Sequence, residues 1–374
     1  MRPLIHKEWV RWVLFTLWFG LINAYPIQAA AIENESFQSE SMRASVLAVE
    51  SHEDLGIFAE GQFVTLEITS GTMKGSVLVV EHHLTDNPVY DIPVEPGDRV
   101  LLVRDEFGPD EVEYYIVDYI RDISIFWILL VFIILLLMIG RWKGVKTIAT
   151  LILTFFMILR VLLPGMLRGY PPIPLTIGVS VIITLSTIFL INGINKKSVA
   201  AVIGIIGGLM AAGLVMFITG SQVRLTGLSS EEAVMLMYIP QLVQFDFRDL
   251  LFAGIIMGAL GAVMDVGMSI SSSLTEIDQA NPSLSSKELM KSGMNVGRDI
   301  MTTMSNTLIL AYTGAALPLL LLFMAYETSL IKIMNLDLIA TEIVRALSGS
   351  IGLLLTIPLT AAVSVFLLKH HDSS

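Results

Sequence analysis

The sequence predicts an α-helical polytopic membrane protein that carries a small extracytoplasmic all-β domain. Hydrophobic residues make up 54% of the 374 residues and charged residues only 15%, whereas a soluble domain carries about 25% charge. Apolar segments of membrane-crossing length recur from residue 123 onward, and short β-branched runs precede them. There is no cysteine, which excludes disulfides and thiolate metal sites. No basic surface suited to nucleic acid is present.

Residues 1–30 have the layout of a secretory signal peptide. Basic residues between Arg2 and Arg11 precede an apolar core at Trp12–Ile22, and small residues follow at Ala29–Ala31. This core is short for a membrane span, which favours a cleaved signal peptide. An uncleaved signal anchor is the alternative. In both cases the chain that follows is exported.

Residues 31–122 are expected to form an acidic β-rich domain, with 20 Asp and Glu against 5 Lys and Arg. Five β-branched runs are separated by Gly, Asn, Pro and Asp, which is typical of a small barrel or sandwich. Five strands in this length suit an OB-like barrel. The runs are RASVLAVESH, GQFVTLEITSG, KGSVLVVEHHL, DRVLLVRDEF and EYYIVDYI.

Residues 123–374 are expected to form a multispan helical domain, because each apolar segment approaches the roughly 20 residues that cross a bilayer. The seven segments are Ile123–Gly140, Thr147–Leu163, Ile173–Ile191, Val199–Ile218, Leu250–Ile270, Asn306–Met324 and Ile351–Leu368.

Basic residues in the short loops predict the orientation, since cytoplasmic loops carry an excess of Lys and Arg. One set of loops holds nine such residues and the opposite set five. The richer set then faces the cytoplasm, together with the C-terminus, and residues 31–122 lie outside. The nine are Arg141, Lys143, Lys146, Lys196, Lys197, Lys287, Lys291, Arg298 and Lys369.

Within the signature hairpin at residues 250–324, the segment GAVMDVGMSISSSLTEI puts a carboxylate near the inner end of an apolar span. Polar residues follow Asp265 at helical spacing, and glycines precede it on the same face. The glycines suit close helix packing, as does the pair Gly204 and Gly208. The complete stripe is Gly254, Gly258, Gly261, Asp265, Ser269, Ser272 and Glu276.

The next helix repeats this pattern. Ser285 and Glu288 have the spacing of a capping box, which predicts a helix start. Arg298 is the expected cationic partner of Asp265. The polar residues Asn295, Asp299, Thr302, Asn306 and Thr313 share one face of that helix.

Polar groups within a bilayer generally face a bundle interior or a water-filled path. We therefore expect the two helices to face each other around a cytoplasm-facing vestibule, with Asp265 and Asp299 as cation or proton sites. The alternative is a structural seam in which Ser, Thr and Asn only join two helices by hydrogen bonds.

The stretch DVGMSISSSLTEI…NPSLSSKELMKSGMNVGRDIMTTMSNTLILAYTG at residues 265–314 resembles the signature region of the YibE/F family of bacterial multi-pass membrane proteins. The resemblance continues more loosely from Ile123 to the C-terminus, and members of the YibE type carry an exported N-terminal β-domain. It implies a bacterial cytoplasmic-membrane protein, sometimes occurring as two related chains. It implies no established activity and no catalytic residue.

The leading functional expectation is a transporter or exporter of an ion or small solute. A second is the membrane subunit of a larger complex, docking an ATPase or a second membrane chain through the loop at 276–297. A third is a membrane scaffold or sensor. No nucleotide-binding, HExxH or GxSxG motif occurs, so neither an enzyme nor a cofactor is expected. The expected partners are the lipid bilayer and another copy or a related chain, without nucleic acid.

Overall fold

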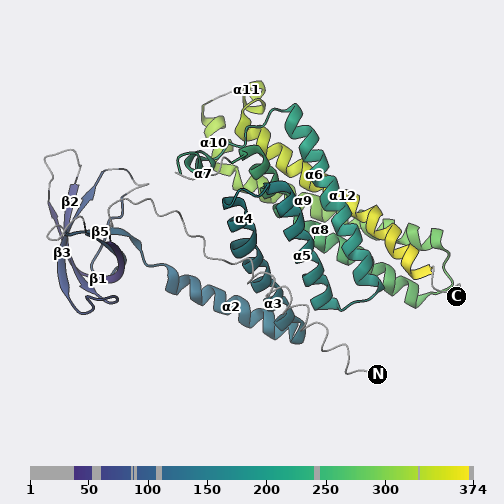
Figure 1. The fold of residues 1–374 in the computed structure, drawn as a ribbon, viewed down its shortest axis with the longest axis horizontal. Coiled ribbons are helices and arrows are strands. Elements are labelled where there is room, and N and C mark those ends of the chain that lie inside the picture. The colour runs from purple at the N-terminus through teal and green to yellow at the C-terminus, as the bar shows by residue number, and fades with distance from the viewer. Residues whose placement is uncertain are drawn as a thin grey trace. The chain divides into compact units, whose positions relative to one another are not determined.

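The structure is a computed structural model that describes residues 38–52, 60–85, 87, 91–106, 112–239, 245–326 and 329–369. The predicted signal segment at residues 1–30 lies outside these residues. The chain divides into two compact units between Leu135 and Leu136, and Figure 1 shows their elements.

The first unit contains a five-stranded antiparallel sheet in the order β3-β2-β1-β4-β5. Each strand coincides with one of the five predicted runs, so the all-β expectation is confirmed. The bounds are β1 Gln38–His52, β2 Glu60–Ile68, β3 Val77–Leu84, β4 Arg99–Glu106 and β5 Val112–Tyr119.

The sheet curves into a partly open barrel. Its two edge strands, β3 and β5, contact each other. Alternate side chains point inward along each strand, and fully buried residues such as Met42, Val64 and Val100 fill the interior. At Gly97, φ is +99°, a backbone conformation that suits glycine. The sequence PGD thereby makes the tight turn that leads into β4.

The second unit is helical, and α2 leads into it. The helices are α2 Asp122–Gly140, α3 Trp142–Met157, the π-helical turn η1 Ile158–Leu162, α4 Leu163–Leu167, α5 Pro172–Asn192, α6 Lys196–Gln222, α7 Glu231–Leu236, α8 Phe247–Ala280, α9 Ser286–Ala315, α10 Leu317–Ala325, α11 Leu330–Met334 and α12 Asp337–Lys369.

Among the described residues, six helical segments are long and apolar enough to cross a membrane, and a bent pair would make a seventh. The chain is thus a multi-pass membrane protein with a β-domain. The expected span Asn306–Met324 is not one straight helix, since α9 and α10 meet at 60°. Pro318 stands at the start of α10, and proline cannot continue the hydrogen bonding of a preceding helix.

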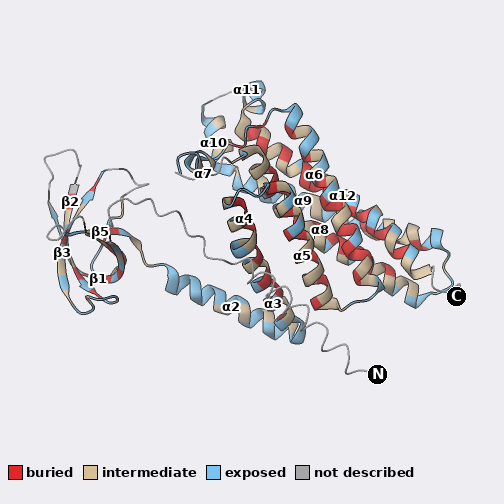
Figure 2. Ribbon diagram, in the orientation of Figure 1, coloured by how far each residue is buried: buried red, intermediate tan, exposed pale blue. Residues whose placement is uncertain are grey.

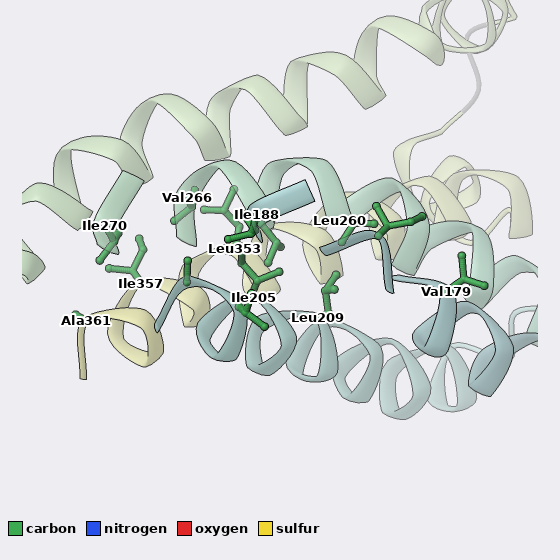
Figure 3. Packing of buried hydrophobic residues seen from close by; sticks show 14 of the residues in the cluster. Val179, Ile188, Ile205, Leu209, Leu260, Val266, Ile270, Leu353, Ile357 and Ala361 are labelled. Atoms are coloured by element: carbon green, nitrogen blue, oxygen red, sulfur yellow. The ribbon is translucent and has the colours of Figure 1, made fainter. Parts of the chain in front are cut away.

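Helices α6, α8 and α12 pack on one another at the centre of this unit, and α5 and α9 pack against them. The shared core includes Ile205 and Leu209 of α6, Val266 of α8, and Leu353 and Ile357 of α12 (Figure 3). By contrast, α2 has no buried residue and is exposed along its length in Figure 2.

Candidate functional site

The polar stripe predicted on α8 lies on the face turned away from the core. Asp265 and Ser269 are exposed, as are Gly254, Gly258, Gly261 and Glu276, and Ser272 is half-buried. The opposite face is apolar and fully buried, with Val263, Ile270 and Leu274 in the core. These seven polar and glycine positions are called the α8 stripe below.

The first half of helix α9 has the same two-sided organisation. Leu289, Gly293 and Gly297 are buried on one side. The opposite side, called the α9 face below, is exposed at every position. It consists of Lys291, Asn295, Arg298, Asp299, Thr302, Asn306 and Thr313.

The two helices pack through their apolar sides near the turn that joins them, not through their polar faces. A Cβ atom placed on Gly293 would stand 2.9 Å from Leu274 of α8, and one on Gly297 would stand 2.2 Å from Ile357 of α12 and 3.4 Å from Ile270 of α8. Gly293 lets α9 approach α8 closely, and Gly297 lets it approach α12, so the contacts of α9 here are apolar. The expectation that α8 and α9 face each other through their polar groups is wrong at this contact.

These two contacts also set the relative level of the antiparallel helices. Gly293 lies beside Leu274 and Gly297 beside Ile270. Moving four residues forward along α9 therefore corresponds to moving four residues back along α8. Continuing this register places Thr302 at the level of Asp265. Farther from the turn between the helices, the Tyr312 hydroxyl lies 3.4 Å from where a Cβ of Gly258 would stand, within three residues of that register.

Neither carboxylate has a cationic partner among the described residues. The guanidinium of Arg298, which was expected to pair with Asp265, instead donates to Asn295 Oδ1 at 3.0 Å along its own helix. Asp265 and Asp299 therefore stand exposed on membrane helices without an ion pair in that part of the chain.

Basic residues in the first turns of separate helices lie at one end of the helical unit. Lys146 donates to the carbonyl of Ile191 at 3.3 Å, and Lys197 lies 3.4 Å from Ser272 Oγ. The Ser271 hydroxyl donates to the carbonyl of Lys197 at 2.6 Å. Asp265 lies six residues beyond Ser271 toward the other end of α8, which is ~9 Å at 1.5 Å per residue.

Of the five glycines expected to mediate helix packing, two lie at a tight contact. A Cβ on Gly204 would stand 1.9 Å from Thr360 Oγ1, and one on Gly208 would stand 1.8 Å from Thr356 Oγ1. At Gly254 and Gly261 an added Cβ meets no atom within 4 Å. The α6–α12 contact is therefore close, whereas Gly254 and Gly261 of the α8 stripe have open space beside them.

Sequence reasoning missed the α12 side of that contact. Small residues recur there at every fourth position, which is a helix-packing pattern in membranes, and all five are buried. They are Ser348, Gly352, Thr356, Thr360 and Ser364.

The N-terminal half of α12 also carries an ion pair that the sequence analysis did not predict. Arg345 and Glu342 are joined at 2.6 Å and are partly buried. Both lie close enough to Tyr312 of α9 to act on it electrostatically. The sequence does contain a signal for this pair, since an Arg three residues after a Glu lies beside it on a helix. Among the described residues no group of three His, Asp or Glu side chains could hold a metal ion.

Residues 128–370 match the family model described as YibE/F-like protein, and residues 52–119 match the YibE/F family N-terminal domain. No curated protein and no solved structure matches the chain.

Proposed function

The chain belongs to the YibE/F family, and from the exposed carboxylates of α8 and α9 we propose that it forms the membrane part of a transporter for an ion or small polar solute. Its place would be the bacterial cytoplasmic membrane. The lysine-rich end of the helical unit and the C-terminus would face the cytoplasm, with residues 31–122 outside.

Asp265 carries this proposal. It is exposed, has no cationic partner among the described residues, and lies ~9 Å from the level of the lysines. A carboxylate in contact with lipid at such depth is costly, so such groups generally face protein or a water-filled path. A neutral Ser or Asn could form a purely structural hydrogen bond without this cost.

Asp265 would bind a cation or relay a proton. Asp299, Asn295 and Asn306 would line the inner half of the route, since they share the exposed α9 face. Arg298 and Glu276 would stand at its mouth. Because both polar surfaces turn outward from the chain's own core, the route would be completed by a neighbouring membrane chain or by water.

The test is ion flux in liposomes that contain the purified full-length chain. Asp265→Asn keeps the size of the side chain and removes its charge, so we expect flux to fall to the level of empty liposomes. Ser269→Ala, one turn away on the same stripe, should keep most of the flux. Full flux through a well-folded Asp265→Asn protein would overturn the assignment.

A second candidate function is that of a subunit docked by a cytoplasmic partner through residues 276–297. Lys287, Glu288 and Lys291 are exposed there, which favours a polar docking surface. Leu289, in the same segment, is fully buried in the chain's own core and is not part of that surface. Chemical cross-linking at Lys287 and Lys291 in native membranes, followed by mass spectrometry, would identify a bound nucleotide hydrolase.

A further inference from the structure

We propose that α10 and α11 do not cross the membrane but lie along one of its surfaces, where their exposed apolar side chains bind the lipid leaflet. This surface is the one remote from Lys146 and Lys197, called the far boundary below. The two helices, Leu317–Ala325 and Leu330–Met334, lie at one end of the helical unit in Figure 1. The inference does not depend on transport.

Helix α9 reaches the far boundary before α10 begins. Gly297 lies beside Ile270 of α8, which is two residues, or ~3 Å, from the level of Ser272. Lys197 contacts Ser272, so this is the level of the basic residues. Ala315, the last residue of α9, lies 18 residues beyond Gly297, ~27 Å along the helix. The total of ~30 Å equals the thickness of the hydrocarbon core.

Helix α12 gives the same level independently. Gly297 also lies beside Ile357 of α12. Asp337, the first residue of α12, lies 20 residues before Ile357, ~30 Å along the helix. The end of α9 and the start of α12 are therefore within ~3 Å of one level. The helices that connect them, of nine and five residues, are each too short to cross the hydrocarbon core.

The bend between α9 and α10 turns the chain along the boundary. The two helices meet at 60°, so the ~14 Å length of α10 advances only ~7 Å along the α9 axis. No residue of α10 is buried, and all nine are apolar except for the backbone. Met324 and Tyr326 are 77% and 75% exposed. Tyrosine is typical of the membrane–water interface, so α10 lies in lipid just below the headgroups.

The sides of α11 are ordered as in a helix that lies on a membrane surface. Leu330, Ile331 and Met334 are 78%, 80% and 57% exposed, and at 3.6 residues per turn they share one side. Lys332 is exposed on the opposite side, and Ile333 between them is half-buried. The apolar side can therefore enter the acyl chains while Lys332 extends to the phosphate groups.

The charges favour lipid over another protein chain as the occupant. Lys332 is the one charged residue of α10 and α11, and among the described residues it forms no ion pair. A lipid supplies both an anionic phosphate and the acyl chains that cover the adjoining apolar side. The exposed surface of α10 is also continuous with that of the membrane helix α9.

Depth-dependent quenching tests this placement, because the chain has no cysteine of its own. Ile331→Cys and Lys332→Cys are each labelled with a polarity-sensitive fluorophore in the full-length protein. The proteins are reconstituted in vesicles of phosphatidylcholine and phosphatidylglycerol. The fluorophore at residue 331 should emit at shorter wavelength than the one at residue 332. An acyl-chain spin label near the headgroup should quench it more than a spin label at the chain end.

Phe155→Cys calibrates the depth. Phe155 is 63% exposed on α3 and lies nine residues from Lys146, ~14 Å along the helix and so near the bilayer centre. The chain-end spin label should quench this position more. The same order of quenching at residue 331 would mean that the segment enters the membrane core, which overturns the proposal. Equal emission at residues 331 and 332, or no quenching at residue 331, would overturn it as well.

A second pair of variants tests α10 and does not depend on α11. Leu321→Cys and Leu322→Cys, at positions 59% and 49% exposed, should both be quenched more by the spin label near the headgroup, because α10 has no polar side. Quenching at residues 321 and 331 should stay constant when the protein is diluted into excess lipid. Quenching that appears only on dilution would assign this surface to a second copy of the chain and would sink the proposal.

Discussion

Gly204 of α6 lies so close to Thr360 of α12 that a Cβ atom on the glycine would stand 2.8 Å from the Cα of the threonine. One turn further along, Gly208 and Gly352 repeat this backbone approach. Membrane helices pack tightly where small residues allow it, because lipid supplies no hydrophobic drive for their association. This contact joins the two central helices of the bundle.

Gly204→Ala should therefore destabilise the protein. The new methyl group meets backbone as well as the Thr360 hydroxyl, and overpacking of this kind costs typically 1–3 kcal/mol. Thermal unfolding in mild detergent should shift to lower temperature. Gly254→Ala adds the same methyl group in open space and should leave the transition unchanged. Equal unfolding temperatures for the two variants would contradict the tight contact.

Lys369 should stabilise the turn between α8 and α9. Its Nζ lies 2.6 Å from Asp278 Oδ1, both side chains are largely buried, and it also donates to the carbonyl of Pro282 at 2.9 Å. Removing one partner of a buried pair leaves an unpaired charge, so Lys369→Met should cost up to about 3 kcal/mol.

The matched control for this pair is Arg121→Met. Arg121 and Asp118 form an exposed pair at 2.5 Å, which is expected to contribute less than about 1 kcal/mol. Adding Asp278→Asn to Lys369→Met should recover part of the loss. A double-mutant cycle with no coupling between residues 278 and 369 would argue against the ion pair.

His82 should make the β-domain sensitive to acid. Burial lowers the pKa of His82 below its ordinary value of 6.5, against the opposing effects of its hydrogen bond to Ile92 and of Asp91. The folded domain then binds its proton less readily than the unfolded chain. The stability that neutral His82 contributes is present above pH 6.5 and is lost as the pH falls through the lowered pKa.

Hydrogen exchange of the β3 amides in the full-length protein, corrected for intrinsic rates, would measure this loss. His82→Gln keeps a donor for the Ile92 carbonyl and does not titrate, so its protection should change less with pH. Protection that falls equally in both proteins would assign the effect to other groups.

Ser285 should hold the start of α9. Its hydroxyl accepts from the Glu288 amide at 3.3 Å, and the Glu288 carboxylate accepts from the Ser285 amide at 2.9 Å. Ser285→Ala removes half of this capping box and should cost about 1 kcal/mol. Faster hydrogen exchange at the first α9 amides would report the loss. Ser286→Ala, at the first helical position, should have little effect there.

The sequence by itself determined the local elements. β-Branched alternation fixed the five strands, apolar length fixed the membrane helices, and the Ser285–Glu288 spacing fixed the start of α9. These signals depend on neighbours in the chain, so they can be read without a fold. The same holds for the polar periodicity of α8 and α9, which predicted that each helix has one polar face.

Only the tertiary structure decided where those faces point. Gly293 lets the apolar side of α9 approach Leu274 of α8, and Gly297 lets it approach Ile357 of α12, so burial of these apolar side chains outweighs contact between polar groups. Likewise Gly204 packs against Thr360, whereas an added Cβ at Gly254 or Gly261 would meet no atom. Periodicity gives the angle of a side chain around its own helix axis, but contacts between distant segments set which face is buried.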